Sequence, residues 1–133
     1  MDMEPFRLAR IAGIGLVIAA FPAIAGEADV IDVKVRAAAP RVCDFDVTVR
    51  SVDRGGDYYA DAFEVLAPDG RLLGRRELLH PHETEQPFTR ELYGVAIPPG
   101  VHEVIVRARH KPKGYDGATR MVKLPCADRD GRK

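Results

Sequence analysis

A short stretch in the middle of the 133-residue chain carries the residue types best suited to chemistry. His80-Pro81-His82-Glu83 places two imidazoles and one carboxylate side by side. Because Pro81 favours an extended backbone, the two imidazoles on alternate residues can face one side. Imidazole and carboxylate groups suit zinc and copper ions. His-Pro-His is a weak pattern by itself, so the stretch predicts either a copper or zinc site or a structural, proline-stiffened loop.

Patterns typical of enzymes find little support elsewhere in the chain. Ser51 is the only serine, and no G-x-S-x-G pattern surrounds it. Asp44 and Asp46 could in principle form a carboxylate pair for glycoside chemistry, but strand alternation places them on a solvated face. No Gly-rich loop follows a strand and opens a helix, which argues against nucleotide binding. The sequence therefore predicts a protein that is not an enzyme and requires no cofactor, with copper or zinc as the exception just described.

The charge balance limits the classes of partner. The chain has 20 basic and 20 acidic residues and a formal net charge of zero, with both signs interspersed. Nucleic-acid binding usually needs a basic face that attracts phosphates. The sequence therefore predicts no nucleic-acid partner and leaves a protein partner in the cell envelope as the expected class.

The first 25 residues differ from the rest of the chain. Arg7 and Arg10 precede an uncharged run over 11–25 that ends in Ala-Ile-Ala. This pattern predicts a signal helix, residues 1–25, cleaved after Ala25. The run is shorter than the roughly 20 residues of a membrane span, although an uncleaved N-terminal anchor is the alternative. We therefore expect a periplasmic or secreted protein without a stable membrane span after cleavage.

Only two cysteines occur, and both follow the predicted signal. In an exported protein an even number of cysteines favours disulfide pairing, here between Cys43 and Cys126. Two free, metal-binding or catalytic thiols are the alternative.

Apolar and polar residues alternate with period two along much of the chain, as in half-buried strands. The clearest example runs from Cys43 to Arg50, where Cys43 and every second residue after it are expected to face the core. A helix is the rival prediction for 71–80, but Gly74 and the following prolines argue against it. The predicted strands are 29–36, 43–50, 58–66, 71–79, 88–97, 102–110 and 118–124.

Turn signals separate these strands. Pro68-Asp69-Gly70 predicts a hairpin, and Pro98-Pro99-Gly100 predicts a break. Near Gly94 the apolar parity shifts between Leu92 and Val95, which predicts a bulge. Seven short strands without a repeat predict an all-β, seven-stranded antiparallel sandwich over 26–126. Residues 127–133 are predicted to be a flexible charged tail.

Three segments carry a resemblance to a known architecture: Phe63 with the hairpin after it, Gly94–Gly100, and Val104–Ala108 with Gly114–Gly117 beyond it. Together they resemble an immunoglobulin-like or fibronectin-type-III-like β-sandwich domain of a secreted bacterial protein. The chain departs from that pattern in having no Trp, so Phe63 is expected to fill the core position. It also lacks a Tyr at the start of the sixth strand, where His102 stands. The resemblance implies an architecture and no particular function.

The resemblance also implies which segments meet in space. Cys43 and Cys126 would lie at one pole, close enough to pair. The connections after the second, fourth and sixth strands would lie at the opposite pole. His110 would then join His80, His82 and Glu83 as candidate metal ligands, while His102 would lie at the cysteine pole.

Two functions follow from this arrangement. The first is a non-catalytic, exported binding or structural module that acts through the loops of one pole, with Asp53, Lys111, Lys113 and Tyr115 as contacts. Tyr115 at a loop tip can anchor a partner, or it can pack back over the sandwich. The second function is that of a periplasmic copper- or zinc-binding protein that uses His80, His82 and His110.

Overall fold

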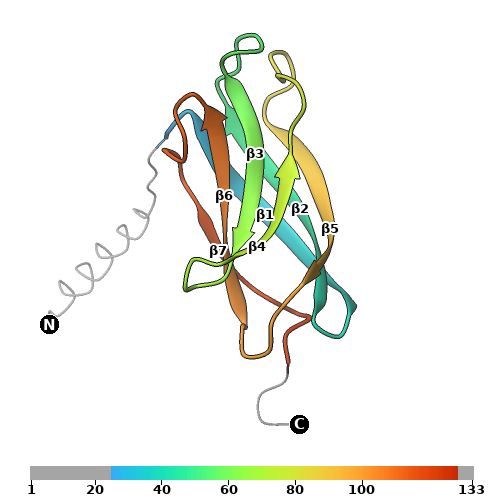
Figure 1. The fold of residues 1–133 in the computed structure, drawn as a ribbon. Helices are drawn as coiled ribbons and strands as arrows, with labels where there is room; N and C mark the ends of the chain where they lie inside the picture. Colours follow the sequence, from blue (N-terminus) through green and yellow to red (C-terminus); the bar gives the residue numbers. More distant parts are fainter. Residues whose placement is uncertain (1–24, 129–133) are drawn as a thin grey trace, which may run out of the picture.

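The computed structural model describes residues 25–128, which form seven β-strands in two antiparallel sheets (Figure 1). One sheet has the order β1-β2-β5 and the other the order β4-β3-β6-β7. The predicted all-β sandwich is therefore confirmed. The predicted signal peptide, apart from Ala25, and residues 129–133 of the predicted tail lie outside the described residues. The strands are β1 (Ala28–Ala39), β2 (Val42–Ser51), β3 (Tyr59–Leu66), β4 (Leu72–Glu77), β5 (Phe88–Ala96), β6 (Glu103–Lys111) and β7 (Arg120–Lys123).

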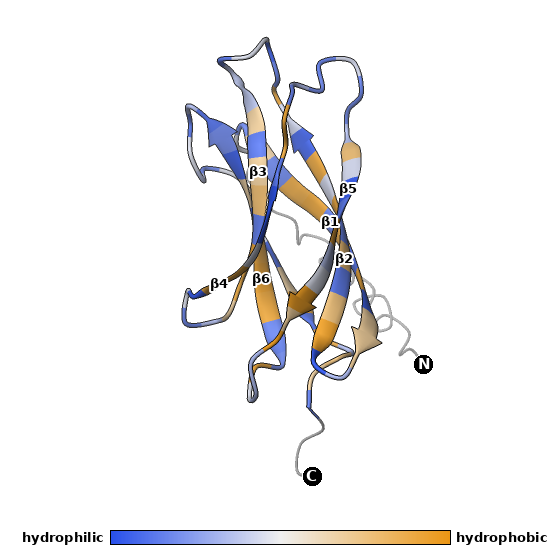
Figure 2. Ribbon diagram, turned by 45° about the vertical axis from the view of Figure 1, so that its right-hand side comes forward, coloured by the Kyte–Doolittle hydropathy of each residue, from blue (hydrophilic) through white to orange (hydrophobic). Residues whose placement is uncertain are grey.

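The core lies between the two sheets and follows the alternation in the sequence. Every second residue of β2 is buried, beginning with Cys43, and β6 repeats the pattern from Val104. Figure 2 shows hydrophobic and hydrophilic residues alternating along β2 and β3. The largest fully buried apolar side chains are Phe45, Phe63 and Phe88. Burial of each of these side chains contributes roughly 1.5–3 kcal/mol to the stability of the fold.

The predicted bulge in β5 is present. Cys43 pairs with Val95 and Phe45 pairs with Leu92, so two residues of β5 lie opposite Asp44. Gly94 has φ +67, and its amide donates to the Asp44 carboxylate at 2.7 Å. The bulge explains how Leu92 and Val95 can both face the core despite their odd spacing.

The disulfide is also confirmed. Cys43 at the start of β2 is bonded to Cys126 beyond β7, with their Cα atoms 5.7 Å apart. The Arg41 amide donates to the Cys126 carbonyl at 2.8 Å, which adds a backbone link beside the bond. The chain beyond β7 is thereby fixed to the sheet that contains β1, β2 and β5.

All seven observed strands differ in extent from the predicted ones, and the largest differences are in β1, β4 and β7. β1 continues to Ala39, three residues beyond its predicted end. The segment 71–79 is a strand rather than a helix, but β4 ends at Glu77. β7 begins at Arg120 rather than at Ala118, because the Ala118 backbone bonds the other sheet. Its carbonyl accepts from the Val30 amide at 2.9 Å, and its amide donates to Asp29 at 2.8 Å. Within the described part of the chain, we find no helix with the length and hydropathy needed to cross a membrane.

Candidate functional site

Three connections meet at one end of the sandwich. We define the upper pole as residues 52–58, 78–87 and 112–119, which connect β2 to β3, β4 to β5 and β6 to β7. In Figure 1 these segments lie at the upper end, while the chain reaches the disulfide at the lower end. The structure thus places the three loops together, at the pole opposite the cysteines.

Asp53 links two of the three connections of the upper pole. Its side chain is completely buried, although the sequence predicted it as a partner contact. One carboxylate oxygen accepts from the Ser51 hydroxyl at 2.8 Å and from the Ala60 amide at 3.0 Å. The other accepts from the His82 amide at 2.7 Å. Asp53 therefore holds the loop over 78–87 against the end of β2 and the start of β3, and its side chain presents no surface to a partner.

Gln86 and Glu83 add further links between the same two loops. The Gln86 side-chain amide donates to the His82 carbonyl at 2.9 Å, and its carbonyl accepts from the Ser51 amide at 2.8 Å. The Glu83 carboxylate accepts from the Gly55 amide at 2.5 Å. Glu83, a predicted metal ligand, is therefore occupied with a backbone N–H. The Gln86–His82 bond lies within the 78–87 connection, whereas the Gln86–Ser51 and Glu83–Gly55 bonds span 35 and 28 residues of sequence and attach this connection to the end of β2 and to the β2–β3 connection.

His80 and His82 lie next to each other, as the His-Pro-His spacing predicted. Their ring centroids are 4.7 Å apart, and the His82 ring stacks on Phe88 at 3.9 Å. Arg90 Nη2 lies 3.0 Å from His82 Nε2. A guanidinium can only donate, so Nε2 is the acceptor and the proton of the neutral ring is on Nδ1. His82 Nδ1 is buried without a hydrogen-bond partner, 4.0 Å from Asp53 Oδ2.

His110 does not join this pair. It is fully buried, and its Nε2 donates to the Val52 carbonyl at 2.8 Å. Its ring packs edge-on against Tyr58, with ring centroids 4.5 Å apart. Within residues 25–128, no group of three or more His, Cys, Asp or Glu side chains is arranged to hold a metal ion. The structure therefore does not bring the predicted ligands His80, His82, Glu83 and His110 into one copper or zinc site.

The predicted contacts of the β6–β7 connection differ in their exposure. Lys111 and Lys113 are exposed. Tyr115 is 43% exposed, but its hydroxyl donates to Glu64 at 2.9 Å, and Arg107 stacks on its ring at 3.7 Å. Burial raises the pKa of Glu64, yet the hydrogen bonds from Tyr115 and Arg107 outweigh it and lower the pKa overall. Tyr115 thus packs back over the sheet while remaining partly exposed.

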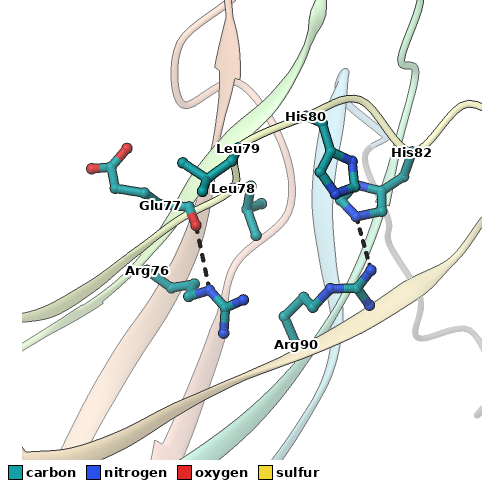
Figure 3. A pocket seen from close by; sticks show the side chains of 7 residues that line it. All are labelled: Arg76, Glu77, Leu78, Leu79, His80, His82 and Arg90. Carbon is teal, nitrogen blue, oxygen red and sulfur yellow. Dashed lines mark hydrogen bonds between the residues drawn. The ribbon is translucent and has the colours of Figure 1, made fainter.

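A pocket of about 200 Å³ lies beside the histidine pair, between β4 and β5. Figure 3 shows that Arg76 from β4 and Arg90 from β5 both extend toward it. Its lining residues are Arg76, Glu77, Leu78, Leu79, His80, His82 and Arg90. Neither arginine was predicted from the sequence as a site residue, although each occupies a core-facing position in its strand, where a charged side chain is unusual.

The buried position of His82 leads to a pH-dependent stability. Burial lowers the pKa of His82, and the charges of Arg90 and His80 lower it further, against the opposing effects of Asp53 and Glu85. Below the ordinary value of about 6.5 the unfolded chain therefore binds more protons than the folded one. We expect the free energy of unfolding to be constant near pH 7.5 and to decrease as the pH falls through 6.5 toward the lowered pKa.

Urea unfolding at pH 7.5 and pH 5.5 measures this effect. His82→Gln should reduce the difference between the two values, whereas the matched change His102→Gln at the lower pole should leave it unchanged. An unaltered pH dependence in His82→Gln would show that His82 is not the responsible group.

Comparison with known proteins adds one relative. No protein-family model and no solved structure matches the chain. The chain is 43% identical over 96 residues to a protein of Halomicrobium mukohataei described as "Putative lipoprotein". The match includes 72% of this chain and 47% of that protein, so the chain spans about half the length of the relative. The two antiparallel sheets support the resemblance to immunoglobulin-like or fibronectin-type-III-like domains as far as a β-sandwich, and no family match defines it further.

Proposed function

We propose that this chain is a non-catalytic, exported β-sandwich that binds a protein partner in the cell envelope through its upper pole. The observation that carries the proposal is the buried Asp53 carboxylate, which joins loops distant in sequence. A surface built from loops that are fixed before binding loses less conformational entropy on association. Binding residues are commonly found on loops that a rigid scaffold positions.

Two observations support export. Disulfides persist mainly outside the reducing cytosol, and Cys43 and Cys126 form one. The Halomicrobium relative is described as a lipoprotein of uncertain assignment. Because the two cysteines are bonded to each other, neither thiol is free to carry a lipid, so we transfer only the envelope location and not the mode of attachment.

The strand order supports the fibronectin-type-III-like form of the sandwich. In a constant-type immunoglobulin domain the fourth strand joins the sheet of the first, second and fifth. Here β4 pairs with β3 in the other sheet. We include this form in the proposal as a description of architecture, and we expect the domain to require no cofactor.

Site-specific photo-crosslinking in cells of the source organism tests the proposal. A photoreactive residue would replace Lys113 or Thr84 at the upper pole, or Asp69 in the turn between β3 and β4 at the lower pole. All three positions are exposed, so the fold should tolerate the photoreactive residue at each of them. We expect a discrete protein adduct from 113 and 84 and none from 69. Adducts of equal yield at all three positions, or none at the upper pole, would contradict the proposal.

A further inference from the structure

The pocket beside the histidine pair lies where the edges of the two sheets face each other. β4 is the last strand of one sheet and β5 the last strand of the other, and neither has a second partner strand among the described residues. The pocket of about 200 Å³ opens between them. Ligand pockets for drug-sized molecules are usually about 300–1,000 Å³. This pocket therefore suits a single small chemical group rather than a whole large ligand.

Two arginines enter this pocket from core-facing positions. Arg76 of β4 lies opposite Phe63 in the strand register, and Arg90 of β5 lies opposite Val47. Phe63 and Val47 are fully buried, so both arginines point toward the space between the sheets. Placing two cations at such positions carries a desolvation cost unless partners compensate it.

The protein's own groups only partly compensate the desolvation cost of the two guanidinium groups. Arg76 donates to the backbone carbonyls of Glu91 at 2.6 Å and Glu77 at 3.3 Å. The Glu77 carboxylate bonds Arg75 instead, and Figure 3 shows it directed away from the Arg76 guanidinium. Arg90 donates to the Thr89 carbonyl at 2.8 Å and contacts one carboxylate, that of Glu85 at 3.3 Å, whose side chain is 57% exposed. Among the described residues, Arg90 thus has one carboxylate partner, located at the solvent edge, and Arg76 has none.

The histidines do not supply the missing negative charge. His82 Nε2 accepts from Arg90, which orients that guanidinium and requires an unprotonated nitrogen on the ring. The stacking of His82 on Phe88 fixes the ring, and the His80 ring lies beside it with centroids 4.7 Å apart (Figure 3). The pocket therefore offers N–H donors and positive charge, with Leu78 and Leu79 as its apolar wall.

We infer that this pocket binds an oxyanion group, a carboxylate or a phosphate, between Arg76 and Arg90. Guanidinium groups bind both classes through paired, charge-assisted hydrogen bonds. Leu79, which is 83% exposed, contacts the part of the ligand next to that group. The inference rests on the proposed function in one respect, since His80 and His82 belong to the upper pole, and it gives the chemical class that a partner would present there.

Nuclear magnetic resonance titration of the purified domain tests the inference. Sodium acetate and inorganic phosphate would be added separately at neutral pH, with sodium chloride at equal ionic strength as the reference. We expect saturable shifts of the Arg76 and Arg90 Nε–H signals and the His82 ring signals, with a Kd on the order of 1–10 mM for the preferred anion. The stronger of the two titrations identifies the carboxylate or the phosphate class.

Variants separate a specific site from general charge. Arg76→Gln and Arg90→Gln should each weaken the binding about tenfold or more, the loss expected for one charge-assisted hydrogen bond. Arg71→Gln makes the same charge change at the lower pole, where Arg71 pairs with Asp69, and should leave the affinity unchanged. The wild-type protein supplies an independent readout if a variant unfolds, because a bound anion should displace the His82 titration to higher pH.

Failure of this inference is distinguishable from failure of the proposed function. Linear shifts of equal size for acetate, phosphate and chloride would overturn the oxyanion site and leave the two arginines as charges that protect exposed sheet edges. Acetate or phosphate binding that is unchanged in Arg76→Gln and Arg90→Gln would also overturn the oxyanion site. The crosslinking pattern at the upper pole is measured in cells with the native partner and does not depend on free anions.

Discussion

Replacement of Cys43 and Cys126 by alanine is expected to destabilise the domain by about 2–5 kcal/mol. The disulfide joins residues separated by 83 positions. Its removal therefore frees the unfolded chain from a closed loop that includes most of the sandwich, which raises the conformational entropy of the unfolded state. For a loop of this length the chain-entropy model gives about 4–5 kcal/mol before native-state strain is considered. The change also unties the segment beyond β7, where Leu124 and Cys126 contribute to the core.

Urea unfolding of the double variant measures this loss. The oxidised and reduced wild-type proteins provide the matched comparison, because reduction opens the bond without removing the sulfur atoms. A thermal midpoint lower by at least about 8 °C should accompany a loss of 2 kcal/mol in a domain of this size. A difference below about 1 kcal/mol between the oxidised and reduced forms would contradict the assigned role of the disulfide.

Replacement of Asp53 by alanine is expected to cost about 3–5 kcal/mol. The change leaves three donors without their acceptor, namely the Ser51 hydroxyl and the amides of Ala60 and His82. Each hydrogen bond to a charged group contributes about 1.5–3 kcal/mol, and the donors' incomplete rehydration limits the sum. The loss of stability should appear first as local opening of the upper pole, because all three donors lie in it or next to it.

Asp57→Ala is the control for this substitution. Asp57 lies in the same connection between β2 and β3 but is exposed, so its removal should change the stability by no more than about 0.5 kcal/mol. Equal destabilisation by Asp53→Ala and Asp57→Ala in urea unfolding would show that the loss comes from net charge and not from the buried hydrogen bonds.

The strands and their buried faces could be predicted from the sequence because both depend on local alternation. Cys43, Phe45 and their neighbours follow a period of two that only a half-buried strand satisfies. Gly94 allowed the bulge to be predicted because a shift of apolar parity beside a glycine is typical of a residue inserted into one strand of a pair. The disulfide could be predicted from an even number of cysteines, the expected export of the chain and the sandwich topology that the resemblance implied.

The upper pole could be predicted only in outline. Loop order indicated which connections share a pole, but the hydrogen bonds of Asp53 join residues up to 29 positions apart and depend on loop conformation. Arg76 and Arg90 line one pocket from two different sheets. The alternation of apolar and polar residues does not specify how those two sheets lie relative to each other. For His110 a signal was present: it continues the core-facing parity of Val104, Val106 and Ala108, which indicates a buried ring and not a ligand at the surface.

Two connections of the upper pole, 52–58 and 78–87, are expected to form one rigid unit around Asp53, and native-state hydrogen exchange measures this directly. In the wild-type protein the Ala60 and His82 amides should exchange slowly, with opening free energies within about 1 kcal/mol of each other. In Asp53→Ala both should exchange much faster while the β6 amides remain protected. Exchange of the wild-type His82 amide as fast as that of the exposed Gly56 would contradict a rigid upper pole and, with it, the proposed binding surface.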